Sequence, residues 1–217
     1  MGKLYFLGGE NIAKRDAKDV NVAAFRDAGG APNVLAFSWA RASFDKTYKR
    51  RKRLISYFRS LGADSVNFSE YSDSPDEIST HLASADLVYL TGGQVGVLAA
   101  RARSKGLDKF LRGYSGVIVG RSAGAMVMGK LCFVTNRYSG RRKVVGGFGM
   151  VDFSIKAHYH ASQDALLKRF FGNERVYAVP HGSALVYNLE SGLLTSVGEV
   201  FVFVKGEKAV FSEAAGQ

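Results

Sequence analysis

The six residues Gly-Arg-Ser-Ala-Gly-Ala at positions 120–125 constrain the fold more than any other stretch of the chain. A short apolar run at 117–119 precedes them, and residues 126–128 continue into a segment typical of a helix. A strand that turns sharply into a helix needs small residues beside the turn, because bulky side chains would clash there. Such a turn exposes the side chain of Ser122 and aims the following backbone N–H groups at a developing oxyanion. The pattern predicts a nucleophilic serine. The alternative is a tight turn in which Ser122 only caps the helix.

Strand-like and helix-like patterns alternate along the first 130 residues. The expected strands cover residues 3–7, 33–37, 65–68, 86–90 and 116–119, and the expected helices cover residues 20–28, 44–61, 74–85 and 95–104. The third helix has the clearest start, because Ser74 is followed by Pro75 and two acidic residues. The alternation predicts an α/β fold, a three-layer sandwich in which helices cover both faces of a mostly parallel central sheet.

Two loops follow expected strands at their carboxyl ends, where the working loops of parallel sheets lie. One is Thr-Gly-Gly-Gln at 91–94, and the other contains Ser122. If their strands are neighbours, the backbone N–H groups of Gly93 and Ala123 can face one substrate oxygen as an oxyanion hole. Gly92 and Gln94 belong to the first of these loops, and we expect them to contact the substrate.

Beyond residue 130 the pattern changes to short strand-like segments separated by glycines. They cover residues 133–134, 143–145, 151–155, 175–179, 184–187, 199–204 and 209–211, with one amphipathic helix at 161–171. The last of these segments are expected to close the sheet and to include an antiparallel edge. No linker, repeat or low-complexity segment interrupts the chain, so we expect one domain over residues 1–217.

The composition is ordinary for a soluble globular protein, with 47% hydrophobic and 23% charged residues. No apolar run approaches the roughly 20 residues that cross a bilayer. The apolar run at the N-terminus is too short for a signal peptide. Cys132 is the single cysteine, so no intrachain disulfide can form, and we expect it to be a buried small apolar residue. The sequence therefore predicts a cytoplasmic protein with no membrane partner.

The formal net charge of +11 raises the question of a nucleic-acid partner. The densest basic run, at 46–53, opens a predicted helix and fits a solvated helix face. The sequence contains no RNA-binding aromatic motif, zinc-ligand spacing or convincing helix-turn-helix pattern. We therefore expect no nucleic-acid partner, and note that the charge can also attract acidic substrates.

A serine hydroxyl is a poor nucleophile at neutral pH and needs a base within hydrogen-bond reach. His81 is expected on a helix surface, whereas His158 and His160 follow one predicted strand and His181 follows another. The spacing of His158 and His160 could suit a metal, but no third ligand is near them in sequence, so we expect no metal. The sequence favours the use of one of these imidazoles as the base.

Four segments together resemble peptidase family S51, which includes aspartyl dipeptidase (peptidase E) and cyanophycinase. They are Leu-Thr-Gly-Gly-Gln at 90–94, Gly-Arg-Ser-Ala-Gly-Ala at 120–125, Ala-His-Tyr at 157–159 and Val-Pro-His-Gly-Ser-Ala-Leu at 179–185. Their order and spacing fit along nearly the whole chain. The resemblance implies a flavodoxin-like sandwich related to class I glutamine amidotransferases. It also implies that Ser122 is the nucleophile, His158 the general base, and Gly93 and Ala123 the oxyanion donors, with no metal or organic cofactor.

Position 181 departs from the family pattern, in which a glutamate usually orients the base. His181 stands there in this chain, and a neutral imidazole stabilises an imidazolium less than a carboxylate does. Three arrangements stay open: His181 completes a weakened triad, a carboxylate such as Asp152 or Asp164 substitutes, or the site is degenerate. We expect an active site in which His181 lies near His158.

The resemblance implies a serine exopeptidase that acts on short peptides, and dipeptidase-type members of the family remove an N-terminal aspartate. Arg121, Arg137 and Arg142 are candidates to bind an acidic side chain, because a guanidinium pairs with a carboxylate through two hydrogen bonds. The alternative is that Arg121 is structural and the other two are solvated.

Two other functions stay open. In an α/β-hydrolase-type esterase the acid lies between serine and histidine in the chain, so Asp152 would serve His158 or His160. The second is a non-catalytic binding protein on the same scaffold. The sequence leaves the oligomeric state open, a homodimer included.

Overall fold

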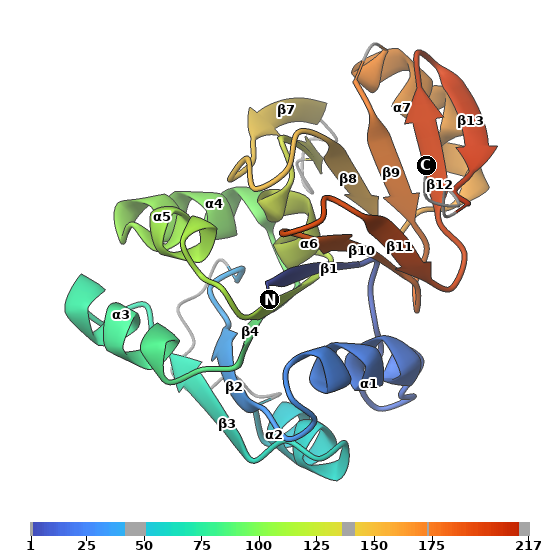
Figure 1. Cartoon of the computed structure of the whole chain (residues 1–217). Helices are drawn as coiled ribbons and strands as arrows, with labels where there is room; N and C mark the ends of the chain where they lie inside the picture. The colour runs from blue at the N-terminus through green and yellow to red at the C-terminus, as the bar shows by residue number, and fades with distance from the viewer. Residues whose placement is uncertain (1, 42–50, 136–141, 173, 213–217) are drawn as a thin grey trace.

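The central sheet has seven strands, five of them parallel. The computed structural model describes residues 2–41, 51–135, 142–172 and 174–212 (Figure 1). The strands of this sheet are β1 (Lys3–Leu7), β2 (Asn33–Phe37), β3 (Ser65–Ser69), β4 (Leu87–Leu90), β5 (Val117–Arg121), β10 (Ala184–Asn188) and β11 (Leu194–Val197). Their spatial order is β11-β10-β1-β5-β4-β2-β3, and β10 and β11 form an antiparallel end. The predicted mostly parallel sheet with an antiparallel edge is confirmed.

Helices cover both faces of this sheet. They are α1 (Lys18–Asp27), α2 (Arg51–Ser60), α3 (Pro75–Ala83), α4 (Val95–Ser104), α5 (Leu107–Arg112) and α6 (Ala123–Met128). Alternate residues of a strand face opposite ways, so Tyr5 and Leu7 of β1 share a buried cluster with α1 and α2, while Leu4 and Phe6 share another with α3 to α6. The two clusters make the three layers of the predicted sandwich.

A second sheet leads into the two predicted histidine segments, since His158 and His181 each follow one of its strands. Its strands are β8 (Ser154–Ala157), β9 (Val176–Val179), β12 (Phe201–Val204) and β13 (Glu207–Val210), in the order β13-β12-β9-β8. It appears in Figure 1 with α7 (Asp164–Phe171), coloured orange to red. Phe153 joins it to the central sheet, because its ring lies 5.7 Å from that of Phe6 and 4.8 Å from that of Tyr177. β8 and β9 are parallel, so their carboxyl ends share one edge.

Local signals placed most elements correctly. The helix start at Ser74 is confirmed as a capping box with Glu77, and the buried Cys132 is confirmed as well. The helix expected at 44–61 is observed from Arg51, and residues 42–50 lie outside the described part of the chain. A hairpin of β6 (Leu131–Thr135) and β7 (Arg142–Gly146) and a 3-10 turn (Ala161–Gln163) complete the described elements.

One local expectation was wrong, and two elements were not predicted. The strand expected at 151–155 runs instead over β8, because the residues before Ser154 turn toward Lys130, whose N–H donates to the Phe153 carbonyl. Helix α5 was not predicted, since six residues between Gly106 and Gly113 are too few to show a helical period. Strand β11 was also missed, because all four of its residues are only partly buried. No helix among the described residues is long and apolar enough to cross a bilayer.

Candidate active site

Ser122 lies at a strained turn between β5 and α6. Its φ of 54° and ψ of −104° are rare for a residue with a side chain. The flanking glycines make the turn feasible. A Cβ on Gly120 would lie 2.5 Å from the carbonyl carbon of Gly124, and a Cβ on Gly124 would lie 2.4 Å from the Leu90 carbonyl oxygen. Small residues are therefore required on both sides of the serine, as the sequence pattern indicates.

The hydroxyl of Ser122 meets the imidazole of His158. The distance between Ser122 Oγ and His158 Nε2 is 2.8 Å. Ser122 precedes α6 as its N-cap but makes no side-chain capping hydrogen bond, so the capping alternative does not hold. His158 follows β8 with a positive φ of 50°, and its N–H donates to the Gly8 carbonyl at 2.8 Å. The two side chains thus come from different sheets and meet where the carboxyl ends of the strands converge.

The surroundings of His158 lower its pKa and so favour the neutral ring. One side of the residue faces solvent, and the burial of the other side is the main cause that lowers the pKa of His158. Positive charge on His181, Lys156 and Arg121 lowers this pKa further. A neutral imidazole can accept the proton of Ser122, so the electrostatics suit a general base near neutral pH.

His181 lies beside His158, and Asp16 lies behind His181. The two imidazole centroids are 5.7 Å apart with 31° between the ring planes. His181 Nε2 lies 3.0 Å from Asp16 Oδ2. The sequence did not single out Asp16. The only available signal was its position in the loop after β1, at the carboxyl edge of a parallel sheet.

The loop after β4 packs against the serine. A Cβ on Gly92 would lie 3.3 Å from the Cβ of Ser122, and a Cβ on Gly93 would lie 2.4 Å from the Ala40 carbonyl oxygen. The Gln94 N–H donates to the same Ala40 carbonyl at 2.5 Å, which fixes the loop. Ala123 is the first residue of α6, where N–H groups have no partner inside the helix. The structure therefore brings both predicted oxyanion residues to the edge that holds Ser122.

Arg121 is largely buried and pairs with a buried carboxylate. Its side chain is 8% exposed, and Nη1 lies 3.6 Å from Oε1 of Glu10, whose side chain is fully buried. Glu10 also accepts hydrogen bonds from the Tyr89 hydroxyl and, at 3.0 Å, from Asn21 Nδ2. The expected contact between Arg121 and an acidic substrate stays a prediction, and the structure shows Arg121 in a buried ion pair with Glu10. Glu10 was missed because a glutamate after a first strand carries no local signature.

Neither alternative carboxylate reaches His158. Asp164 accepts a hydrogen bond from the Tyr159 hydroxyl at 2.5 Å and lies 3.1 Å from Lys208 Nζ. Asp152 is exposed and makes no hydrogen bond or ion pair with His158 among the described residues. The acid expected in an α/β-hydrolase arrangement is therefore not in place.

The remaining candidates lie elsewhere or outside the described chain. His160 is exposed with its Nδ1 3.5 Å from Ser162 Oγ, and His81 lies 3.6 Å from Asp73. Arg137 falls outside the described residues, and only the backbone of Arg142 is described, in β7. Within the described ranges, no three His, Cys, Asp or Glu side chains gather as a metal site.

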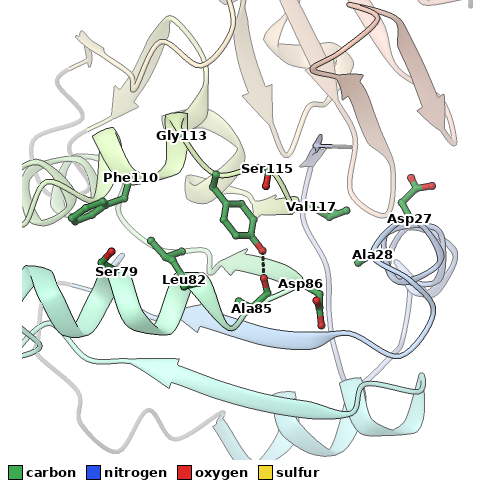
Figure 2. Close-up of a pocket in the computed structure, with 13 residues that line it drawn as sticks. Asp27, Ala28, Ser79, Leu82, Ala85, Asp86, Phe110, Gly113, Ser115 and Val117 are labelled. Carbon is green, nitrogen blue, oxygen red and sulfur yellow. Dashed lines mark hydrogen bonds between the residues drawn. The ribbon is translucent and has the colours of Figure 1, made fainter.

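A hollow of about 510 Å³ lies at the opposite edge of the sheet, where β4 and β5 begin (Figure 2). Its lining includes Leu82, Phe110 and Asp86, and the Tyr114 hydroxyl donates to the Ala85 carbonyl at 2.7 Å. It contains none of the residues around Ser122 and takes no part in the site described above.

Comparisons with known proteins agree with this geometry. The family model of peptidase family S51 matches residues 38–194. A peptidase structure from an acI-B1 Actinobacterium is similar, with a TM-score of 0.77 and 19% identity over 99% of this chain and 95% of that one. A candidate peptidase E protein from Listeria monocytogenes EGD-e has a TM-score of 0.67 and 18% identity over 94% of this chain and 98% of that one. No curated protein matches. Because the family model spans more than half of its residues, the chain belongs to peptidase family S51.

Proposed function

We propose that this chain is a serine peptidase that hydrolyses short peptides through an acyl-enzyme. Membership of peptidase family S51 supports a peptidase. The observation that carries the serine mechanism is the 2.8 Å contact between Ser122 Oγ and His158 Nε2 at a turn with φ of 54°. A strained backbone that presents a hydroxyl to a base is typical of a nucleophile. The Ser122 hydroxyl makes no capping hydrogen bond to α6.

The proposed reaction has two steps. Ser122 Oγ attacks the peptide carbonyl carbon while His158 Nε2 takes its proton, and the tetrahedral oxyanion faces the N–H groups of Gly93 and Ala123. His158 then gives this proton to the leaving amine, the C–N bond breaks, and an ester on Ser122 remains. Water attacks the ester with His158 again as base, which releases the acid and restores the hydroxyl.

We also propose a preference for peptides with an acidic N-terminal residue. The formal net charge of +11 attracts anionic peptides, and the dipeptidase-type resemblance points the same way. Arg121 is committed to Glu10, so the long-range field rather than this guanidinium supports the preference. Gly92 and Gln94 remain the proposed substrate contacts, since Gly92 packs beside Ser122 and Gln94, in the same loop, is exposed.

Replacing Ser122 by alanine tests the nucleophile. We expect Ser122→Ala to abolish covalent labelling by a fluorophosphonate probe and to lower dipeptide hydrolysis by about 10⁴-fold or more. Ser84→Ala is the matched control, because this exposed serine only donates to the His81 carbonyl at the end of α3. The panel should include Asp-Leu, Asn-Leu and Leu-Leu, together with an acyl ester. Hydrolysis that survives Ser122→Ala would remove the nucleophile assignment.

The same assays separate the other functions. An esterase that depends on Asp152 would lose its activity in Asp152→Asn, whereas the proposed peptidase retains it. A non-catalytic binding protein would show no labelling of the wild-type chain.

A further inference from the structure

Asp16 is the carboxylate that the structure brings to position 181. One of its oxygens, Oδ1, accepts the Asn11 N–H at 2.7 Å, and the other lies 3.0 Å from His181 Nε2. The segment that carries His181 is fixed to the same loop, because the Gly182 N–H donates to the Gly9 carbonyl at 2.9 Å. The carboxylate and the imidazole are therefore held in register by the backbone as well as by their own contact.

The two imidazoles share one small space beside Gly9. A Cβ placed on Gly9 would lie 2.5 Å from His158 Nδ1 and 2.9 Å from His181 Nδ1. The same ring nitrogen of each histidine thus faces this backbone, while each Nε2 faces its own partner, Ser122 or Asp16. No hydrogen bond joins the two rings within the described part of the chain, so His181 acts on His158 through charge and packing.

A positive charge on His181 lowers the pKa of His158, after the larger effect of burial. The charged groups that face His158 are His181, Lys156 of β8 and Arg121 of β5, and the charge of Arg121 is balanced by Glu10. Asp16 is the charged group that contacts the ring of His181.

We propose that Asp16 is a positioning residue of this site, which holds the His181 ring beside His158 and so favours the neutral His158 that accepts the proton of Ser122. This inference rests on the proposed function for its catalytic meaning. It also predicts an effect of Asp16 on the titration of His158 that can be measured without any substrate. A carboxylate in direct contact with the base would stabilise the protonated base instead, so the indirect arrangement favours a base that stays available at lower pH.

The sign of the pH effect follows from this contact. Without Asp16 the His181 ring is no longer held beside His158, so a positive charge on that ring lowers the pKa of His158 less. We expect Asp16→Asn to move the midpoint of His158 upward by roughly half to one pH unit, as for two largely solvated charges about 6 Å apart. His181→Gln removes the ring itself and should move the midpoint in the same direction.

The measurement is a histidine Cε1–H NMR titration of the full chain, together with the rate of fluorophosphonate labelling as a function of pH. We expect labelling of Asp16→Asn to fall about threefold to tenfold on the acidic limb and to change less than about twofold at pH 8. Glu174→Gln is the matched control, because this carboxylate is 33% exposed against 31% for Asp16 and pairs with Lys130. Glu174→Gln should leave the His158 midpoint unchanged.

Each outcome decides the proposal. An unchanged or lower His158 midpoint in Asp16→Asn would overturn it, and so would an equal loss of labelling at every pH, which would indicate a purely structural role. If Asp16→Asn does not fold, His181→Gln decides by the same criterion. If the wild-type chain is never labelled, the proposed function fails while the NMR titration still decides whether Asp16 acts on His158.

Discussion

At the scale of single residues, backbone strain is concentrated where the two proposed catalytic side chains meet. Ser122 and His158 both have positive φ values, of 54° and 50°. Each such conformation costs of order 1–3 kcal/mol and persists only where the surroundings fix it. For Ser122 the fixing contacts include its N–H to the Leu7 carbonyl, and for His158 its N–H to the Gly8 carbonyl. The end of β1 therefore holds both residues in place.

Gly9 leaves no room for a side chain beside the two imidazoles. A Cβ there would lie 2.2 Å from His158 Cε1 and 2.9 Å from His181 Nδ1. We expect Gly9→Ala to displace both rings and to lower the rate of fluorophosphonate labelling by about 10- to 100-fold, as expected for a misplaced base. The measurement is the labelling rate at pH 8, with thermal unfolding of the same sample.

Gly30→Ala is the control that separates displacement of the His158 and His181 rings from the effect of backbone strain. Gly30 also has a positive φ, of 93°, but no atom lies within 4 Å of its added Cβ. This variant should lose about 1 kcal/mol of stability and label at the wild-type rate. Equal labelling of the Gly9 and Gly30 variants would show that the space beside Gly9 does not matter.

At the scale of elements, the loop between β1 and α1 supports both halves of the site. Glu10 reaches under β5 to Arg121, the residue before the serine, while Asp16 reaches out to His181. The family model begins at residue 38, so this loop lies outside the matched part of the chain. This loop thus contacts two segments that lie far apart in the sequence, through Glu10 to Arg121 and through Asp16 to His181.

Glu10→Gln should destabilise the fold as well as the site. Its side chain is fully buried against Arg121, so the variant removes the carboxylate from a buried guanidinium. We expect a loss of about 3 kcal/mol in the free energy of unfolding, measured by denaturant titration. An exposed pair is worth only about 0–1 kcal/mol, so Glu174→Gln should change stability little. Equal losses in the two variants would contradict a structural role for the buried pair.

At the scale of the whole molecule, the sequence predicted the layers and the serine turn better than the support around them. The alternating apolar runs and the glycines at 120 and 124 are local signals, because burial and steric clash act on neighbouring residues. The register of Asp16 with His181 joins residues 165 positions apart, and no local pattern records such a contact. Arg121 shows the same limit, since only the tertiary structure reveals that a buried carboxylate takes its charge.

The net charge of the whole molecule predicts that hydrolysis of anionic peptides depends on salt. With a formal charge of +11, the whole surface attracts anionic peptides, and this attraction weakens as salt shortens the Debye length from about 30 Å at 0.01 M to about 8 Å at 0.15 M. We expect kcat/KM for Asp-Leu to fall severalfold over this range while kcat/KM for Leu-Leu changes less than about twofold. Steady-state hydrolysis of the two dipeptides at matched pH measures the difference, and Asn-Leu controls for the shape of the side chain. A preference for Asp-Leu that persists unchanged at high salt would instead indicate a short-range contact at the site, made by a group close to Gln94 or the loop around Ser122, and would exclude the long-range field as its cause.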